Sequence, residues 1–187
     1  KLVHNIYYRE IQRINLFKQQ EDAFVQQLLL HSKPYQIPPG DIVFKTFDVA
    51  EEVSFIMIGL VRICVNDGIR NAVIGYASEG GYFGDFEFYK KCNRLADYQA
   101  VHSCNVLTVS NEVLDSAIFE NVDAGIVFGK GLKKRYELFL YITRLPSKKA
   151  EHDLYLKPSM WVDGSLKLNA DGAGLESIST KKTTRPF

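Results

Sequence analysis

The sequence has few cysteines, no long apolar run and no excess of one charge, and each shortage argues against a class of protein. Three cysteines without a paired Cys-x-x-Cys spacing argue against a disulfide framework or a zinc site, so we expect reduced thiols. No apolar run approaches the roughly 18–20 residues of a membrane span. With 23 basic against 22 acidic residues and a net charge of +1, the chain lacks the basic excess that holds nucleic acid.

The length and composition predict one folded core with an appended segment. A chain of 187 residues with 46% hydrophobic residues is large enough for one substantial core. The charges between Lys1 and Glu10 do not form a signal-peptide pattern, and the missing initiator methionine leads us to expect a fragment of a longer protein. Beyond Pro146 apolar residues become scarcer, so we predict that residues 146–187 form an extended tail with a docking point at Met160–Val162.

The hydrophobic periodicity predicts helices on both sides of a run of short strands. Apolar residues recur at helical spacing over residues 2–17, over 21–31 and from Asn111 to Ile142, where Gly125, Gly129 and Gly131 predict a bend. Segments rich in Val, Ile, Phe and Tyr predict strands at residues 42–47, 53–58, 60–65, 72–77 and 106–110. Short strands at this spacing indicate a sandwich, barrel or roll. We therefore divide the chain into N-terminal helices (1–32), a strand region (33–110), C-terminal helices (111–145) and the tail (146–187).

The segment from Gly80 to Ala96 contains the candidate binding chemistry. Its glycines allow tight turns with exposed backbone N–H groups, and a short helix that begins at Asp85 would add donors for an anion. Arg94 follows after the length of a short helix and a return loop, where its guanidinium could clamp the same anion. Asp85 could accept hydrogen bonds from sugar hydroxyls. The segment therefore predicts an anion site beside an acceptor for a sugar.

Several short segments occur in an order that is familiar from one family. They are Ile14–Phe17, Pro39–Asp41, Phe55–Val61, Gly81–Asp85 and Arg94–Ala96. With them, residues 5–145 resemble the cyclic nucleotide-binding domain of hyperpolarisation-activated and cyclic-nucleotide-gated ion channels. The resemblance implies an α+β fold, in which a jelly-roll-like antiparallel β-roll is flanked by N-terminal helices and C-terminal lid helices. It also implies cAMP or cGMP as the ligand, with no further cofactor and no metal.

The resemblance assigns roles to individual residues. Arg94 matches the arginine that pairs with the cyclic phosphate, and Asp85 matches the acid that bonds the ribose hydroxyl. The last helix, near Leu132–Ile142, matches the lid over the base. The implied binding residues are Gly84, Asp85, Phe86, Glu87, Arg94, Leu95 and Ala96, in a phosphate-binding cassette at about 80–97, and the implied lid residues are Arg135, Tyr136 and Phe139.

Several positions depart from the family pattern. Asp85 is one methylene shorter than the usual glutamate, and Glu87 places a carboxylate near the phosphate where the family has a small residue. Leu95 replaces the Thr or Ser that bonds cGMP, so we expect a preference for cAMP. Phe47 and Ala50 replace turn glycines, so we expect that turn to be built differently.

These observations leave two functions open. The first is a cyclic-nucleotide-responsive regulatory domain of a membrane transport protein, on the cytoplasmic face of the membrane, and the second is a ligand-independent packing and gating module of the same fold. The host is a channel or a sperm-type sodium/proton exchanger. The expected partners are a cyclic nucleotide, the transmembrane pore or transporter domain of the same chain, and a second copy bound through the N-terminal helices.

Two other classes of function are disfavoured. No His, Cys or Ser has partners at nucleophile or metal-ligand spacing, so an enzyme is the least favoured class. No basic helix-turn-helix follows the lid, so we expect neither a transcription factor nor a nucleic-acid partner.

Overall fold

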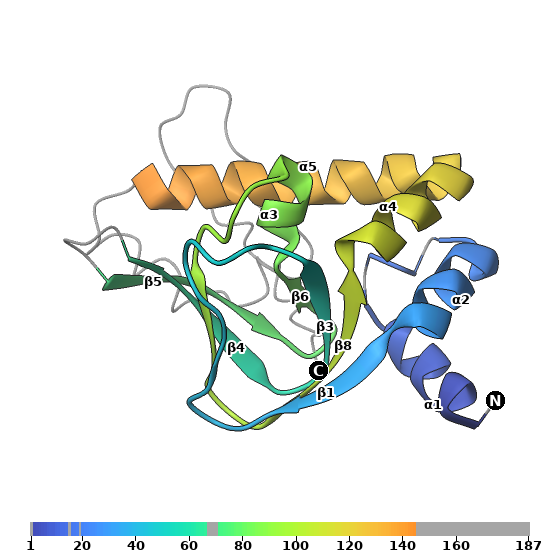
Figure 1. Cartoon of the computed structure of the whole chain (residues 1–187), viewed down its shortest axis with the longest axis horizontal. Helices are drawn as coiled ribbons and strands as arrows, with labels where there is room; N and C mark the ends of the chain where they lie inside the picture. The colour runs from blue at the N-terminus through green and yellow to red at the C-terminus, as the bar shows by residue number, and fades with distance from the viewer. Residues whose placement is uncertain (1, 15, 19, 67–70, 145–187) are drawn as a thin grey trace, which may run out of the picture.

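The computed structural model describes residues 2–14, 16–18, 20–66 and 71–144, and the predicted antiparallel roll flanked by helices is confirmed (Figure 1). The N-terminal helices are α1 (Leu2–Ile11) and α2 (Asp22–His31). The strands are β1 (Lys33–Ile37), β2 (Ile42–Phe44), β3 (Glu52–Ile58), β4 (Leu60–Asn66), β5 (Asn71–Ser78), β6 (Tyr82–Phe83), β7 (Asp97–Ala100) and β8 (Cys104–Ser110). The remaining helices are α3 (Asp85–Lys90), α4 (Asn111–Glu120) and α5 (Val122–Arg144). The predicted tail, with Met160–Val162, lies outside the described residues.

The strands form two four-stranded antiparallel sheets. One sheet has the order β1-β8-β3-β6 and the other has the order β2-β7-β4-β5. In the first sheet Phe55 lies opposite both Leu107 and Tyr82, and in the second Val61 lies opposite both Ala77 and Ala100. Because β1 is an edge strand, it tolerates Pro34, which has no backbone N–H to donate to a neighbouring strand.

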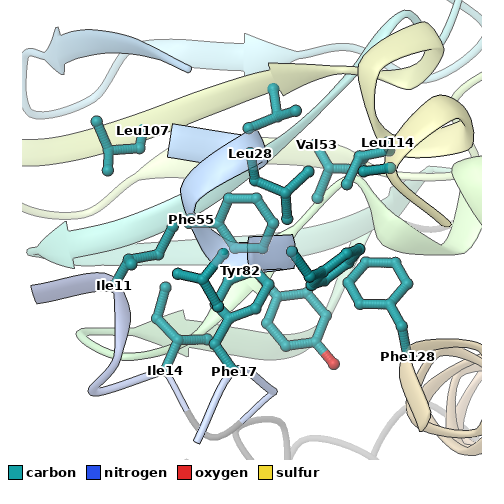
Figure 2. Close-up of a cluster of buried hydrophobic side chains, with 14 of the residues drawn as sticks. Ile11, Ile14, Phe17, Leu28, Val53, Phe55, Tyr82, Leu107, Leu114 and Phe128 are labelled. Carbon is teal, nitrogen blue, oxygen red and sulfur yellow. The ribbon is translucent and has the colours of Figure 1, made fainter. Parts of the chain in front are cut away.

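The central strand β3 separates two hydrophobic clusters. Successive side chains of a strand point to opposite faces, and both faces of β3 are buried. Val53, Phe55 and Met57 pack toward the helices, in a cluster that includes Phe17, Phe24 and Phe128, and Figure 2 shows part of this cluster. Ile56 points to the other face, into the interior of the roll. We call these the helix-side cluster and the roll cluster.

Three predicted details of the helices and strands are wrong. The first helix ends at Ile11 rather than at residue 17, because turns bonded from Arg13 to Glu10 and from Phe17 to Ile14 replace the helical pattern. The strands β1, β6 and β7 are absent from the predicted set. Strand β6 has two residues, β7 has four, and β1 contains Pro34. Short strands of this kind have too few residues for a clear alternation.

The predicted bend at the glycines of the last helix is also wrong. The chain breaks at Asn121 instead, where the side-chain amide donates to the carbonyl of Ala117 at 2.8 Å and to Gln27 at 3.0 Å. The three glycines lie within the continuous helix α5. A Cβ on Gly125 would lie 2.8 Å from a methyl carbon of Ile118, so this glycine allows close packing of α5 against α4 rather than a bend.

Helix α5 extends across the molecule beside α3 and α4 (Figure 1). Its first half contributes Phe128 and Leu132 to the helix-side cluster. Its second half contributes Leu138, Phe139 and Ile142 to the roll cluster. One helix therefore covers both cores. No helix in the described part of the chain is long and apolar enough to span a membrane.

Candidate functional site

Gly84 and the short helix α3 bring the cassette side chains into the interior. Gly84 has a φ of +83°, which favours glycine, and its backbone turns the chain from β6 into α3. A Cβ at this position would lie 2.6 Å from Nη1 of Arg94. Asp85 and Glu87 are each 1% exposed and Arg94 is 2% exposed. The structure therefore brings the three predicted charged residues together below the surface.

Arg94 is held by backbone carbonyls and an aromatic ring. Its Nη2 donates to the carbonyl of Glu52 at 2.8 Å and its Nη1 to that of Gly84 at 3.3 Å. The guanidinium carbon lies 3.5 Å from the centre of the Phe44 ring. Burial lowers the pKa of Arg94, and the negative charge of Glu87 opposes that shift. The Nε atom is buried and has no hydrogen-bond partner among the described residues.

The carboxylate of Glu87 lies where three donors converge. Its Oε1 accepts from the backbone N–H of Leu95 at 2.9 Å and from the hydroxyl of Tyr98 at 3.0 Å. Its Oε2 lies 3.7 Å from Nη1 of Arg94 and 3.2 Å from the same hydroxyl. Burial raises the pKa of Glu87, against the lowering effects of the Leu95 N–H and the Arg94 charge. Burial also raises the pKa of Tyr98, which remains a hydroxyl donor.

Asp85 forms a buried ion pair with the lid helix. Nε of Arg135 lies 2.7 Å from Oδ2 of Asp85, and Nη2 lies 3.0 Å from Oδ1. The same Nη2 donates to the carbonyl of Tyr82 at 2.9 Å, and the guanidinium carbon lies 4.1 Å from the centre of the Tyr82 ring. Burial is the largest single effect and lowers the pKa of Arg135, but the charge and hydrogen bond of Asp85, together with Tyr82 and Tyr98, outweigh it, so the net shift of the pKa is upward. Asp85 therefore binds α5, and its role toward a ribose stays a prediction.

The remaining predicted residues lie around these pairs. Phe86 and Ala96 are buried in the roll cluster, and Leu95 packs against it while partly exposed. On the lid, Phe139 meets Phe86 with ring centres 4.8 Å apart, and Tyr136 stacks on Phe139 with centres 6.1 Å apart. The lid residues therefore contact the cassette directly.

Sequence reasoning missed Tyr98, Phe44 and Tyr82 as parts of the site. Phe44 and Tyr98 are buried in the roll cluster, while Tyr82 belongs to the helix-side cluster. The alternation of buried Ala96, just before β7, with Tyr98 and Ala100 on β7 is the one signal that places Tyr98 in the roll interior. The contacts of these side chains with Glu87, Arg94 and Arg135 depend on the pairing of distant strands, which no local pattern specifies.

The turn before β3 is hydrogen-bonded to the backbone of Arg94. The N–H of Phe47 donates to the carbonyl of Arg94, and the N–H of Arg94 donates to the carbonyl of Asp48, each at 2.9 Å. Phe47 has a φ of +75°, in the left-handed region that favours glycine. The turn therefore has the left-handed backbone conformation that glycine adopts easily, but the residue in that conformation is Phe47.

Comparison with known proteins agrees with this geometry. Residues 34–121 match the family model described as "Cyclic nucleotide-binding domain". A cone photoreceptor cyclic nucleotide-gated channel alpha subunit from Gallus gallus is 26% identical over 126 residues, which cover 64% of this chain and 17% of the channel. The cyclic nucleotide-gated channel alpha-3 of Homo sapiens is 25% identical over the same length, covering 64% of this chain and 18% of the channel. The chain therefore spans under a fifth of these channels.

A solved structure supports the fold. The regulatory subunit of a cAMP-independent protein kinase A from Trypanosoma brucei, as a triple variant bound to cAMP in its A site, has a TM-score of 0.61 at 15% identity. The match covers 83% of this chain and 52% of that subunit. Together with the two-sheet roll, the cassette around Arg94 and the helix α5 across it, these matches lead to one conclusion. Residues 34–121 form a domain of the cyclic nucleotide-binding family, similar to those of cyclic nucleotide-gated channels.

Proposed function

We propose that this domain is a regulatory module of a membrane transport protein whose lid is closed by contacts within the chain rather than by a nucleotide. The observation behind this proposal is the buried pair between Asp85 and Arg135, which joins the cassette to α5. Phe139 packs on Phe86 in the same region, and both belong to the roll cluster. A nucleotide in the roll would have to displace these contacts. The module is therefore regulatory and structural, with no catalytic step.

The membrane context of the proposal depends on the channel relatives. Their matched segments lie within proteins several times longer than this chain. We place the domain on the cytoplasmic face of the membrane, attached to a pore or transporter of the same chain, with α1 and α2 available to bind a second copy. Membrane fractionation of the full protein tests this placement, and recovery of that protein in the soluble fraction would contradict it.

The Trypanosoma brucei subunit bears on both candidate functions through the spacing of its substitutions. The variant with bound cAMP replaces a glutamate by alanine, a threonine seven positions later by arginine, and the next residue, a valine, by alanine. Glu87, Arg94 and Leu95 have the same spacing here. At the first position this chain has glutamate, as in the unsubstituted subunit, and at the second it has arginine, as in the cAMP-bound variant.

The second candidate function is a response to cAMP. Arg94 favours it, because a buried guanidinium with an unpartnered Nε can still donate to a phosphate. Leu95 lacks a hydroxyl, so under this candidate cAMP binds more tightly than cGMP. Binding would require α5 to leave the roll, and the ligand would shift the balance between closed and open lids.

Calorimetric titration of the chain with cAMP and cGMP separates the two candidates, with Arg94→Ala as the site variant. The proposal expects no saturable binding of either nucleotide at millimolar concentration. Binding of cAMP that Arg94→Ala abolishes would overturn the proposal and establish the second candidate. Binding that Arg94→Ala leaves unchanged would show that the nucleotide uses a different site, and both candidates would fail.

A further inference from the structure

The donors around Glu87 form a small anion site that the protein fills with its own carboxylate. Two elements supply the donors: the loop after α3 contributes the Arg94 guanidinium and the Leu95 N–H, and β7 contributes the Tyr98 hydroxyl. All three approach the two carboxylate oxygens of Glu87 within 3.7 Å. A backbone N–H, a hydroxyl and a guanidinium are the groups that bind phosphate oxygens in proteins.

We infer that Glu87 is a built-in anion, which holds the phosphate position of the cassette and excludes phosphorylated ligands from it. This inference extends the proposed function to the specificity of the same site. It rests on the proposed function because it assumes that the cassette keeps its closed shape without a nucleotide. The residue that decides the specificity of this site is then Glu87 rather than Arg94. A phosphate ester cannot approach the same donors while the carboxylate remains, because both are negative and both require the same hydrogen bonds.

The charge count of the buried site supports this inference. Arg94 and Arg135 carry positive charges, and Glu87 and Asp85 carry negative ones, so the four buried side chains balance. An added phosphate would give the cassette an excess of negative charge in a region shielded from water. Replacing Glu87 by a neutral residue leaves one positive charge without a partner, which a phosphate can then neutralise.

The unpartnered Nε of Arg94 is a second, independent observation. Arg94 is almost completely buried, and its other nitrogens donate to the carbonyls of Glu52 and Gly84. A buried N–H without an acceptor is costly, and native proteins rarely leave one. The carboxylate of Glu87 reaches only Nη1, at 3.7 Å. A tetrahedral anion has more acceptor oxygens than a carboxylate, so it can satisfy donors that Glu87 leaves without one.

The test compares the wild-type chain with Glu87→Ala, in which Cγ, Cδ and both carboxylate oxygens are removed. Inorganic phosphate is titrated by calorimetry against chloride of the same ionic strength, and cAMP is titrated in parallel. We expect Glu87→Ala to bind phosphate at least tenfold more tightly than the wild type. Adding Arg94→Gln to Glu87→Ala should remove that gain. Glu79→Ala, which removes an exposed glutamate ahead of the cassette, should bind no better than the wild type.

The outcomes distinguish this inference from the proposed function. Folded Glu87→Ala that binds phosphate no better than the wild type overturns the inference and leaves the closed-lid proposal unchanged. Wild-type protein that binds cAMP overturns the closed-lid proposal. It also overturns the inference if Arg94→Ala abolishes that binding, because a phosphate ester would then share the donors with Glu87. Binding of phosphate but not cAMP by Glu87→Ala supports both, because the lid still excludes the nucleoside.

A refolding measurement covers the case in which Glu87→Ala is unfolded in chloride buffer. Ligands that bind only the folded state stabilise it in proportion to their occupancy. Phosphate at the same ionic strength should then restore the near-ultraviolet circular dichroism spectrum of the wild type. Failure to restore it would overturn the inference.

Discussion

The ion pair between Arg135 and Asp85 offers the sharpest test of how the lid is held. Both side chains are buried, and two contacts of 2.7 and 3.0 Å join them. Arg135→Gln removes one charge and leaves Asp85 buried without its partner. The expected result is a large loss of folding stability, since a buried charge that loses its partner keeps the full cost of its removal from water.

The size of the loss can be worked out from the contacts. At 2.7 Å and an effective dielectric constant of about 20, two unit charges attract by about 6 kcal/mol. Desolvation of both groups offsets much of this attraction, and breaking a buried pair from one side costs about 3–5 kcal/mol in comparable cases. Arg135→Gln also loses the bond to the Tyr82 carbonyl. We therefore expect a loss of about 4 kcal/mol, against total stabilities of about 5–15 kcal/mol for folded domains.

Urea unfolding measures this loss through a double-mutant cycle. The set comprises the wild type, Arg135→Gln, Asp85→Asn and the double variant, with the free energy of unfolding taken from linear extrapolation. The double variant should cost less than the sum of the two single changes by about 2–3 kcal/mol, because it leaves no unpaired charge. Lys134→Gln, on an exposed neighbour in the same helix, is the matched control and should change stability by under about 0.5 kcal/mol.

Two results would refute the reasoning about the lid. A loss of under about 1 kcal/mol in Arg135→Gln would mean that the pair behaves like an exposed salt bridge. Strict additivity of the two single changes would mean that Arg135 and Asp85 do not interact in the folded protein. Either result would remove the main support for a lid that is closed by contacts within the chain.

The remaining predictions concern packing, backbone strain and pH. Phe139→Ala should cost about 3–5 kcal/mol by urea unfolding, because the ring is buried in the roll cluster, whereas Phe119→Ala, at an 84% exposed position, should be nearly neutral. Phe47→Gly should stabilise the chain by roughly 0.5–1 kcal/mol in thermal unfolding by relieving the positive φ, and an equal loss in both Phe47→Gly and Val49→Gly would contradict it. Burial raises the pKa of Glu87 in the folded protein above its value in the unfolded chain. The contribution of Glu87 to folding stability is therefore greatest at low pH and is lost as pH rises through that raised pKa. The stability of the wild type relative to Glu87→Gln should therefore fall as pH increases from about 4, and a pH-independent difference in urea unfolding would contradict the shift.

Local patterns were enough to predict a strand region flanked by helices, and a glycine turn that leads into a short helix at the cassette. The strands β3, β4, β5 and β8 are long enough for β-rich composition to identify them, and the predicted short helix begins at Asp85 as expected. Gly84 and Arg94 can be picked out from a single sequence, because a tight turn favours glycine and an anion site favours arginine. The wrong details have local causes too: β6 is only two residues long, and Gly125 permits close packing of helices rather than a bend.

The sequence alone determined that helices flank a run of strands and that a glycine turn leads into a short helix at Asp85, since helical and strand periodicities and a glycine turn are properties of neighbouring residues. Only the tertiary structure decided what the two cassette carboxylates contact. Asp85 meets Arg135, which is 50 residues away, and Glu87 meets Tyr98 across the roll interior. These contacts depend on how α5 packs over the two sheets. Burial and charge pairing between distant segments, which no local pattern records, therefore determine which groups hold the two carboxylates.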